Sequence, residues 1–303
     1  MMPRPCIVCQ SSDAPLCFQT RDRHYGIQGE FNVVRCNECG LAHLDPMPTA
    51  DELSSFYARD YYAYQPMRRR IGLMGFAKKM LRTRIETHNP RFLAPGEFLD
   101  IGCGSGEYLQ QMRAKGWSVR GVEPSTFGAQ EGRQSGLDIF NGTLLDAKFA
   151  TNSFDYVRSN HSFEHMPNPV EVLNEIYRIL KPGGKLFIGI PNIDSIPYQI
   201  FGRYWWYLGV PVHTYSFSVS TISTLMRRSG FVIDIVHFNS NYASLLGSFQ
   251  IYCNRNNGRT STEGWLIKNP VLMFGTNIVT RALDLMRRGD AIEVIARKDP
   301  IGK

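Results

Sequence analysis

A strand, a glycine-rich turn and a helix follow one another in "GEFLDIGCGSGEYLQQMRAKG", residues 96–116. The apolar run before Gly102 is typical of a buried strand, and Leu109 and Met112 lie on one side of the helix that follows. Gly102, Gly104 and Gly106 let the backbone come close to a ligand at the start of that helix. The segment therefore predicts a sheet that binds its ligand at the carboxyl ends of its strands.

Strands and helices continue to alternate after this turn. "WSVRGVE", "LDIF", "FDYVRS" and "GKLFIGIP" each predict a strand, and "PVEVLNEIYRIL" predicts a helix with one apolar face. This order favours an α/β fold whose parallel sheet is covered on both faces. An apolar insertion at about 240–289 precedes a last strand, "AIEVIARK". Lys268, Pro270 and Arg281 make it a poor transmembrane span, so we expect a packed helix pair or an interfacial membrane helix.

The first sixty residues carry two C-x-x-C pairs, Cys6 with Cys9 and Cys36 with Cys39. Four thiolates complete the tetrahedral shell of a structural Zn²⁺ and leave no open position for catalysis. Buried reduced cysteines are the alternative. We therefore predict a small zinc-ribbon-like module at 1–60.

Basic and apolar residues alternate in "RRRIGLMGFAKKMLRTR", within a linker or helical lid segment predicted at 61–95. A solvated helix is one interpretation, and a surface for anionic lipid or a nucleotide-linked substrate is the other. The net charge of +7 mainly favours solubility. The start "MMPRPCIVC" lacks the apolar core of a secretory signal, so we expect a cytoplasmic protein that could contact the inner membrane face.

Two carboxylates narrow the choice of cofactor. Asp100 precedes the glycine turn, where a carboxylate would repel a pyrophosphate but suits a cationic, amino-acid-bearing cofactor. Glu123 ends the next strand, where an acid can accept hydrogen bonds from ribose hydroxyls.

With these features, residues 96–190 resemble the class I S-adenosylmethionine-dependent methyltransferases. The resemblance rests on "FLDIGCGSG", "GVEPS", "NSFDYVRSNHSFEHMPNP" and "EIYRILKPGGKLFIGIPN" in that order. The cysteine pairs, "GLAHLDPMPT" and "YWWYLGVPVHTYSFS" are similar to a bacterial subgroup with a zinc-binding module, some members of which modify saccharides. The resemblance implies a Rossmann-like, mostly parallel seven-stranded sheet with an antiparallel last strand, within a domain at 96–303.

The resemblance also implies a set of cofactor contacts for S-adenosylmethionine. Glu123 would accept both ribose hydroxyls, and Asn160 and His161 would face the sulfonium. The expected cofactor-binding residues are Asp100, Gly102, Cys103, Gly104, Gly106, Glu123, Pro124, Leu144, Leu145, Asn160 and His161.

Three histidines are candidates for the base that takes a proton from an acceptor hydroxyl: His165, His161 and His213. The stretch "SNHSFEHMPNP" fits the H-x-x-E-H pattern of some zinc peptidases, but that pattern requires a helix. Here a strand precedes it and prolines follow, so we predict a loop between the cofactor and the acceptor. Some quinone O-methyltransferases of the family bring such groups to a divalent ion, which is a further alternative.

We therefore predict an S-adenosylmethionine-dependent methyltransferase (EC 2.1.1) that acts on a hydroxyl of a saccharide or small metabolite. C-methylation of a nucleotide-linked sugar and quinone-type O-methylation are alternatives. A nucleic-acid methyltransferase is disfavoured, because "NHSFEH" stands where base-modifying enzymes carry a proline-proline-aromatic run. A membrane-associated scaffold with a degenerate cofactor fold is the non-enzymatic alternative.

Overall fold

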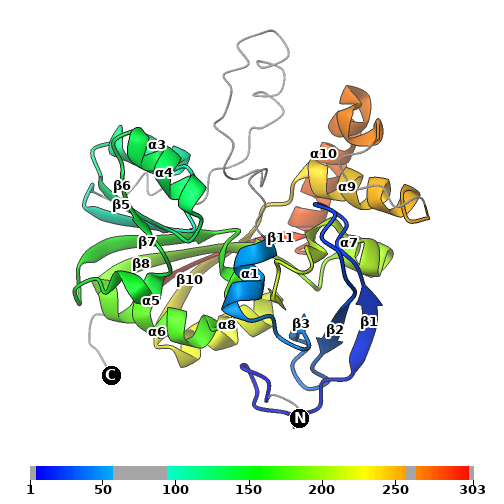
Figure 1. Ribbon diagram of the computed structural model, residues 1–303, viewed down its shortest axis with the longest axis horizontal. Coiled ribbons are helices and arrows are strands. Elements are labelled where there is room, and N and C mark those ends of the chain that lie inside the picture. The colour runs from blue at the N-terminus through cyan, green and yellow to red at the C-terminus, as the bar shows by residue number, and fades with distance from the viewer. Residues whose placement is uncertain (1–4, 57–93, 257–263, 300–303) are drawn as a thin grey trace.

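The computed structural model describes residues 5–56, 94–256 and 264–299. Within these residues the strands form two sheets (Figure 1). The large sheet has seven strands and the small sheet has four. Except for its last two residues, the segment predicted as a basic linker at 61–95 lies outside the described residues, so its interpretation stays a prediction.

The seven-stranded sheet has the predicted mixed topology. In spatial order its strands are β10 (Phe231–Phe238), β11 (Ala291–Lys298), β8 (Leu180–Pro191), β7 (Phe154–Asn160), β4 (Glu97–Ile101), β5 (Ser118–Glu123) and β6 (Asp138–Asn141). The strands from β8 to β6 run parallel, whereas β11 is antiparallel to both β8 and β10. The prediction of an antiparallel last strand is thus confirmed.

Helices cover both faces of this sheet (Figure 1). On one face are α3 (Glu107–Arg113) and α4 (Thr126–Gln134), and on the other are α6 (Pro169–Ile179) and α8 (Val219–Arg228). A one-turn helix, α5 (Leu144–Ala147), follows β6. In α6, Pro169 stands in the first turn and the predicted apolar positions Val172, Leu173 and Ile176 are buried against the sheet. The alternating sequence pattern therefore becomes the predicted three-layer core.

The four-stranded sheet draws its strands from both predicted domains. They are β1 (Leu16–Thr20), β2 (Phe31–Arg35), β3 (Ala42–Leu44) and β9 (Tyr215–Ser216). The first three come from the predicted zinc module, but β9 belongs to the predicted methyltransferase domain and pairs with β3. Cys6 and Leu41 belong to the same buried cluster as Ile222 of α8. The boundary near residue 60 stays a prediction about the chain, while in space the two parts share a sheet and a core.

The other described helices range from three residues to the 16 residues of α10. They are α1 (Ala50–Phe56), η2 (Phe163–His165), α7 (Ile196–Phe201), η3 (Gly202–Tyr204), η4 (Trp206–Leu208), α9 (Tyr242–Cys253), η5 (Leu266–Lys268) and α10 (Pro270–Leu285). The insertion predicted at 240–289 contributes the packed pair α9 and α10. Among the described helices, none combines the length and the apolar character needed to cross a membrane.

Candidate functional site

The loop between β4 and α3 needs its glycines. Gly102, Gly104 and Gly106 have φ angles of 71°, 55° and 77°, in the left-handed region that side chains disfavour. A Cβ on Gly102 would lie 2.4 Å from the Cβ of Ser162, and one on Gly106 would lie 2.3 Å from Cδ1 of Leu137. The loop can therefore lie close against the chain after β7 only because Gly102 has no side chain.

Glu123 holds this loop from the end of β5. Its carboxylate accepts hydrogen bonds from the backbone N–H of Gly104 at 2.8 Å and of Ser125 at 2.9 Å. Burial raises the pKa of Glu123. Each carboxylate oxygen keeps a second lone pair that can accept a further hydrogen bond. The side-chain amide of Asn141, which the sequence analysis did not single out, donates to the carbonyls of Glu123 and Pro124.

Asp100 has a partner that the sequence analysis missed. Nη1 of Arg158, on the neighbouring strand β7, lies 2.8 Å and 3.0 Å from the two carboxylate oxygens of Asp100. Both residues are buried, and the guanidinium also lies over the ring of Tyr108 at 4.0 Å. Most of the charge that the sequence analysis assigned to attracting a cationic cofactor is therefore balanced within the protein. Arg158 could have been singled out as a charged residue near the end of a strand predicted to be buried, but no local pattern identifies Asp100 as its partner.

The remaining predicted cofactor residues lie in the loop itself or follow other strands of the sheet. Cys103 belongs to the loop, and burial raises the pKa of its thiol well above the ordinary value. Leu144 is buried in α5, whereas Leu145 is partly exposed and so can meet a ligand. Asp146 caps α5 through hydrogen bonds from Thr143.

Asn160 and His161 end β7 at the same edge of the sheet. His161 has a φ of 51°, and its N–H donates to the carbonyl of Gly189 at 2.8 Å. Its ring stacks on Tyr207 with centroids 5.5 Å apart. The hydroxyl of Ser162 then donates to the carbonyl of Ile101 at 2.7 Å, which ties the histidine-containing loop to β4. The structure thus brings the loop of residues 160–166 beside the glycine turn.

Glu164, His165 and His213 form a compact cluster. One potential ligand atom from each lies within 4.8 Å of the other two, and the two imidazole rings meet edge to face at 4.6 Å. Glu164 is 1% exposed, and neither of its carboxylate oxygens accepts a hydrogen bond from the described residues. Nδ1 of His161 approaches one of these oxygens to 3.4 Å. The cluster could hold a proton or a divalent cation.

The pKa values of these groups follow from their burial and proximity. Burial disfavours the Glu164 carboxylate, but His161, His165 and His213 outweigh it and lower the pKa to about 2. Burial, together with the neighbouring His213, lowers the pKa of His165 to about 3. Burial also lowers the pKa of His213. Both imidazoles are therefore neutral at pH 7, the state in which a histidine accepts a proton.

The tautomer of His213 is fixed by its environment. Its Nδ1 lies 2.9 Å from the carbonyl oxygen of Tyr207, and because a carbonyl only accepts, Nδ1 must donate. In a neutral ring this leaves Nε2 as the acceptor. Next along the chain, Thr214 donates through its N–H and its hydroxyl to the carbonyl of Glu164. Backbone contacts therefore set both the orientation and the protonation pattern of His213.

The N-terminal module contacts residue 206, next to Tyr207, whose carbonyl holds His213. Nε2 of His24 lies 2.8 Å from the carbonyl oxygen of Trp206, and the two rings meet edge to face at 4.8 Å. Asp22 holds this turn by accepting from the N–H groups of His24, Tyr25 and Ile27. Sequence analysis missed His24 because no pattern near residue 24 indicates a contact with residues 204–218.

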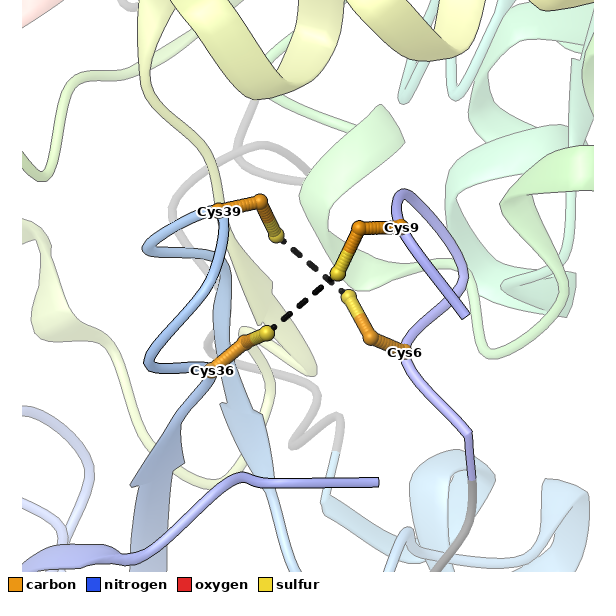
Figure 2. Close-up of side chains that lie close together, drawn as sticks. All are labelled: Cys6, Cys9, Cys36 and Cys39. Atoms are coloured by element: carbon orange, nitrogen blue, oxygen red, sulfur yellow. Dashed lines mark hydrogen bonds between the residues drawn. The ribbon is translucent and has the colours of Figure 1, made fainter. Parts of the chain in front are cut away.

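The four cysteines of the N-terminal module converge from two turns (Figure 2). All four sulfurs lie within 4.8 Å of one another, with Cys6 and Cys39 at 3.5 Å and Cys9 and Cys36 at 3.4 Å. Sulfurs around a tetrahedral zinc would be about 3.8 Å apart, whereas a disulfide requires about 2 Å. Burial opposes ionisation of Cys36, yet the backbone N–H groups of Cys39 and Glu38 lower its pKa to about 7. The cluster suits a structural zinc ion.

Fold and site together define a Rossmann-like α/β protein with a cofactor-type glycine loop and a second, cysteine-rich module. Residues 74–235, just over half of the chain, match the family described as methyltransferase domain, and the chain belongs to this family of class I S-adenosylmethionine-dependent methyltransferases. A solved S-adenosylmethionine-dependent methyltransferase from Archaeoglobus fulgidus has the same fold, with a TM-score of 0.50 and 20% identity over 75% of this chain and 95% of that one.

Two curated relatives share part of the sequence. Ubiquinone biosynthesis O-methyltransferase of Pseudomonas entomophila is 30% identical over 115 residues, which are 36% of this chain and 50% of that protein. Demethylmenaquinone methyltransferase of Listeria welshimeri is 30% identical over 123 residues, which are 36% and 52%. The chain spans about half the length of the curated relatives it matches.

Proposed function

We propose that the chain binds S-adenosylmethionine at the β4–α3 loop and transfers its methyl group to a hydroxyl of a saccharide or small metabolite. The bound cofactor would supply a methyl group on a sulfonium. The loop glycines would bind its methionine part, and Glu123 would accept both ribose hydroxyls through its remaining lone pairs. Leu145 and Pro124 would border the adenine, and Asn160 and His161 would face the sulfonium.

His213 is the base in this proposal, and the carrying observation is its fixed tautomer. With Nδ1 donating to the Tyr207 carbonyl, Nε2 would take the proton of an acceptor hydroxyl. The cofactor would supply the methyl group for an in-line displacement, to which the protein would contribute alignment and exclusion of water. Glu164 would stabilise the imidazolium that forms beside it, while His165 supports the ring edge to face.

Substitution of His213 tests the role of the base. His213→Asn keeps a side-chain amide that can donate to the Tyr207 carbonyl but supplies no base, so turnover is expected to fall by roughly 10²- to 10⁴-fold. Affinity for S-adenosylmethionine, measured by calorimetry, is expected to stay unchanged. His237→Asn, on the exposed face of β10, is the matched control. Equal turnover in the His213 variant would remove this residue from the mechanism.

The acceptor is identified by following the label. The protein is incubated with methyl-labelled S-adenosylmethionine and fractionated cell extract, and the label is expected in a polar saccharide or small-metabolite pool. A lipid-soluble labelled product would instead favour a quinone-type acceptor. The names of the two curated relatives make that second candidate specific.

Chelation tests whether a divalent cation takes part. Loss of turnover after chelation, with the four-cysteine cluster still loaded, would assign a divalent cation to Glu164, His165 and His213.

The four-cysteine cluster is proposed to hold a structural zinc ion. Four sulfur ligands leave no position for substrate, so the ion would stabilise the module without taking part in the chemistry. The pairing of β3 with β9 places the module next to Thr214 and therefore next to His213. Zinc would in this way stabilise the acceptor side from a distance.

A further inference from the structure

Helix α10 presents an apolar stripe to solvent. Val271, Phe274, Ile278 and Leu285 are each between 56% and 87% exposed. Their spacing of three, four and seven residues places them on one face of the helix, which we call the α10 stripe. The opposite face carries Met273 and Thr280, which are buried. In Figure 1, the first turns of α10 project from the body of the molecule.

The part of the sequence that includes this stripe is rich in basic residues. Residues 242–288 contain six Lys and Arg but only two acids, Glu263 and Asp284. The carboxylate of Asp284 is occupied on the inner side, where it accepts hydrogen bonds from the N–H and the hydroxyl of Ser240. Arg281 and Arg287, by contrast, are exposed beside the C-terminal half of the stripe.

An aromatic residue stands where an interfacial helix would need one. Trp265 precedes α10 and is largely exposed. Indole rings favour the boundary between lipid headgroups and acyl chains. An exposed apolar stripe, a cationic border and an exposed tryptophan are together the features of a helix that lies in a membrane surface.

We propose that the α10 stripe docks the protein onto the surface of an anionic lipid bilayer. The 16 residues of α10 extend about 24 Å, so the helix would lie in the plane of the surface, where the stripe enters the interface and the arginines meet anionic headgroups. A second copy of the chain is a poorer occupant, because a second α10 stripe is apolar and offers the arginines no negative charge, whereas an anionic bilayer does. The proposal does not depend on the identity of the acceptor.

Vesicle co-sedimentation tests the proposal with the full-length protein. The probes are vesicles of phosphatidylcholine alone and vesicles of equal parts phosphatidylcholine and phosphatidylglycerol. Binding is expected only to the second, and it is expected to weaken as salt rises. Ile278→Asp places an acid in the stripe and is expected to weaken binding at least about tenfold, because it removes apolar burial and repels the headgroups. Ile278→Ser, which leaves the charge unchanged, is expected to weaken it less.

Leu16→Asp is the matched control. Leu16 lies on edge strand β1 and is 59% exposed, against 58% for Ile278, so both variants add one acid at equal exposure. The control is expected to bind vesicles as the unchanged protein does, and circular dichroism checks that both variants fold. Equal binding of Ile278→Asp and Leu16→Asp to the anionic vesicles would overturn the proposal, as would a full-length protein that binds neither type of vesicle. A lipid-free dimer in analytical ultracentrifugation that Ile278→Asp dissolves would also overturn it, in favour of a second copy.

Discussion

At the scale of single residues, sequence reasoning located the polar groups but not all of their partners. The left-handed turn at Gly102 could be predicted from its residue type, and the place of Glu123 at the end of β5 from the strand pattern, whereas the role of Glu123 as a ribose acceptor stays a prediction. The pairing of Asp100 with Arg158 could not, because it depends on the register between two strands 58 residues apart. The same holds for His24, which lies between β1 and β2 and contacts Trp206 of η4, 182 residues away in the sequence.

The buried ion pair changes what a substitution of Asp100 should do. Asp100→Ala leaves the buried guanidinium of Arg158 without its partner, which typically destabilises a protein by about 3–5 kcal/mol. Urea unfolding is therefore expected to show a clearly lower midpoint for Asp100→Ala. Glu123→Gln leaves an NH2 group facing the backbone N–H of Gly104 or of Ser125, so it is expected to lower the midpoint less than Asp100→Ala does while losing cofactor affinity. An Asp100→Ala protein of normal stability that cannot bind S-adenosylmethionine would instead make Asp100 a direct ligand contact.

Asp290 predicts a dependence of stability on pH. It is fully buried, accepts a hydrogen bond from Ser244, and has its pKa raised from 3.8 to about 6, mainly by burial. A raised carboxyl pKa means that the protonated form is favoured in the folded state. The associated stability is therefore present below about pH 4 and is lost as pH rises through 6, by up to about 3 kcal/mol.

Asp290→Asn is expected to flatten that dependence. Unfolding free energies measured between about pH 4 and pH 7 should fall less steeply in the variant, because its side chain does not ionise. Asp138→Asn, at an exposed position, is the control and should keep the slope of the unchanged protein. Parallel curves for Asp290→Asn and the unchanged protein would show that Asp290 contributes no such linkage.

At the scale of secondary structure, the long periodic elements were predictable and the short paired ones were not. The apolar face of α6 follows from a local pattern and the antiparallel β11 was implied by the family resemblance, and the structure confirms both. Strand β9 has only two residues, too few for a period, and it forms because β3 offers it hydrogen bonds. The outward face of α10 could not be assigned either, because its pattern fits a buried face equally well.

The cysteine cluster joins two turns, residues 6–9 and 36–39, so its loss should destabilise more than these turns. Cys36→Ser is expected to lose the bound zinc and to lower the melting temperature by at least about 5 °C, because metal binding contributes directly to folding. Elemental analysis and calorimetry measure the two effects. Cys17→Ser, an exposed cysteine outside the cluster, is the control and should change neither. Unchanged metal content in Cys36→Ser would contradict the assignment of the cluster.

At the scale of the whole molecule, the N-terminal module shares its core with the methyltransferase domain. Cys6 and Val8 lie in one buried cluster with Leu225 of the sheet-covering helix α8, and β3 completes its sheet with β9. Composition suggested a separable module, because its cysteines differ so clearly from the residues that follow. The shared core could not be foreseen, since it consists of contacts between residues far apart in the sequence.

A chain that begins at residue 94 tests this integration. Without the module, the apolar side chains of α8 that face it become exposed and β9 loses its partner, so the shortened protein is expected to bind a hydrophobic dye and to unfold at lower temperature. Its glycine loop makes no described contact with the module, so some cofactor affinity should persist while acceptor turnover falls with the displaced His213. A shortened chain with the melting temperature and turnover of the full one would show that the module does not stabilise the rest of the protein. The contact between His24 and Trp206 would then have no part in positioning Tyr207 and His213.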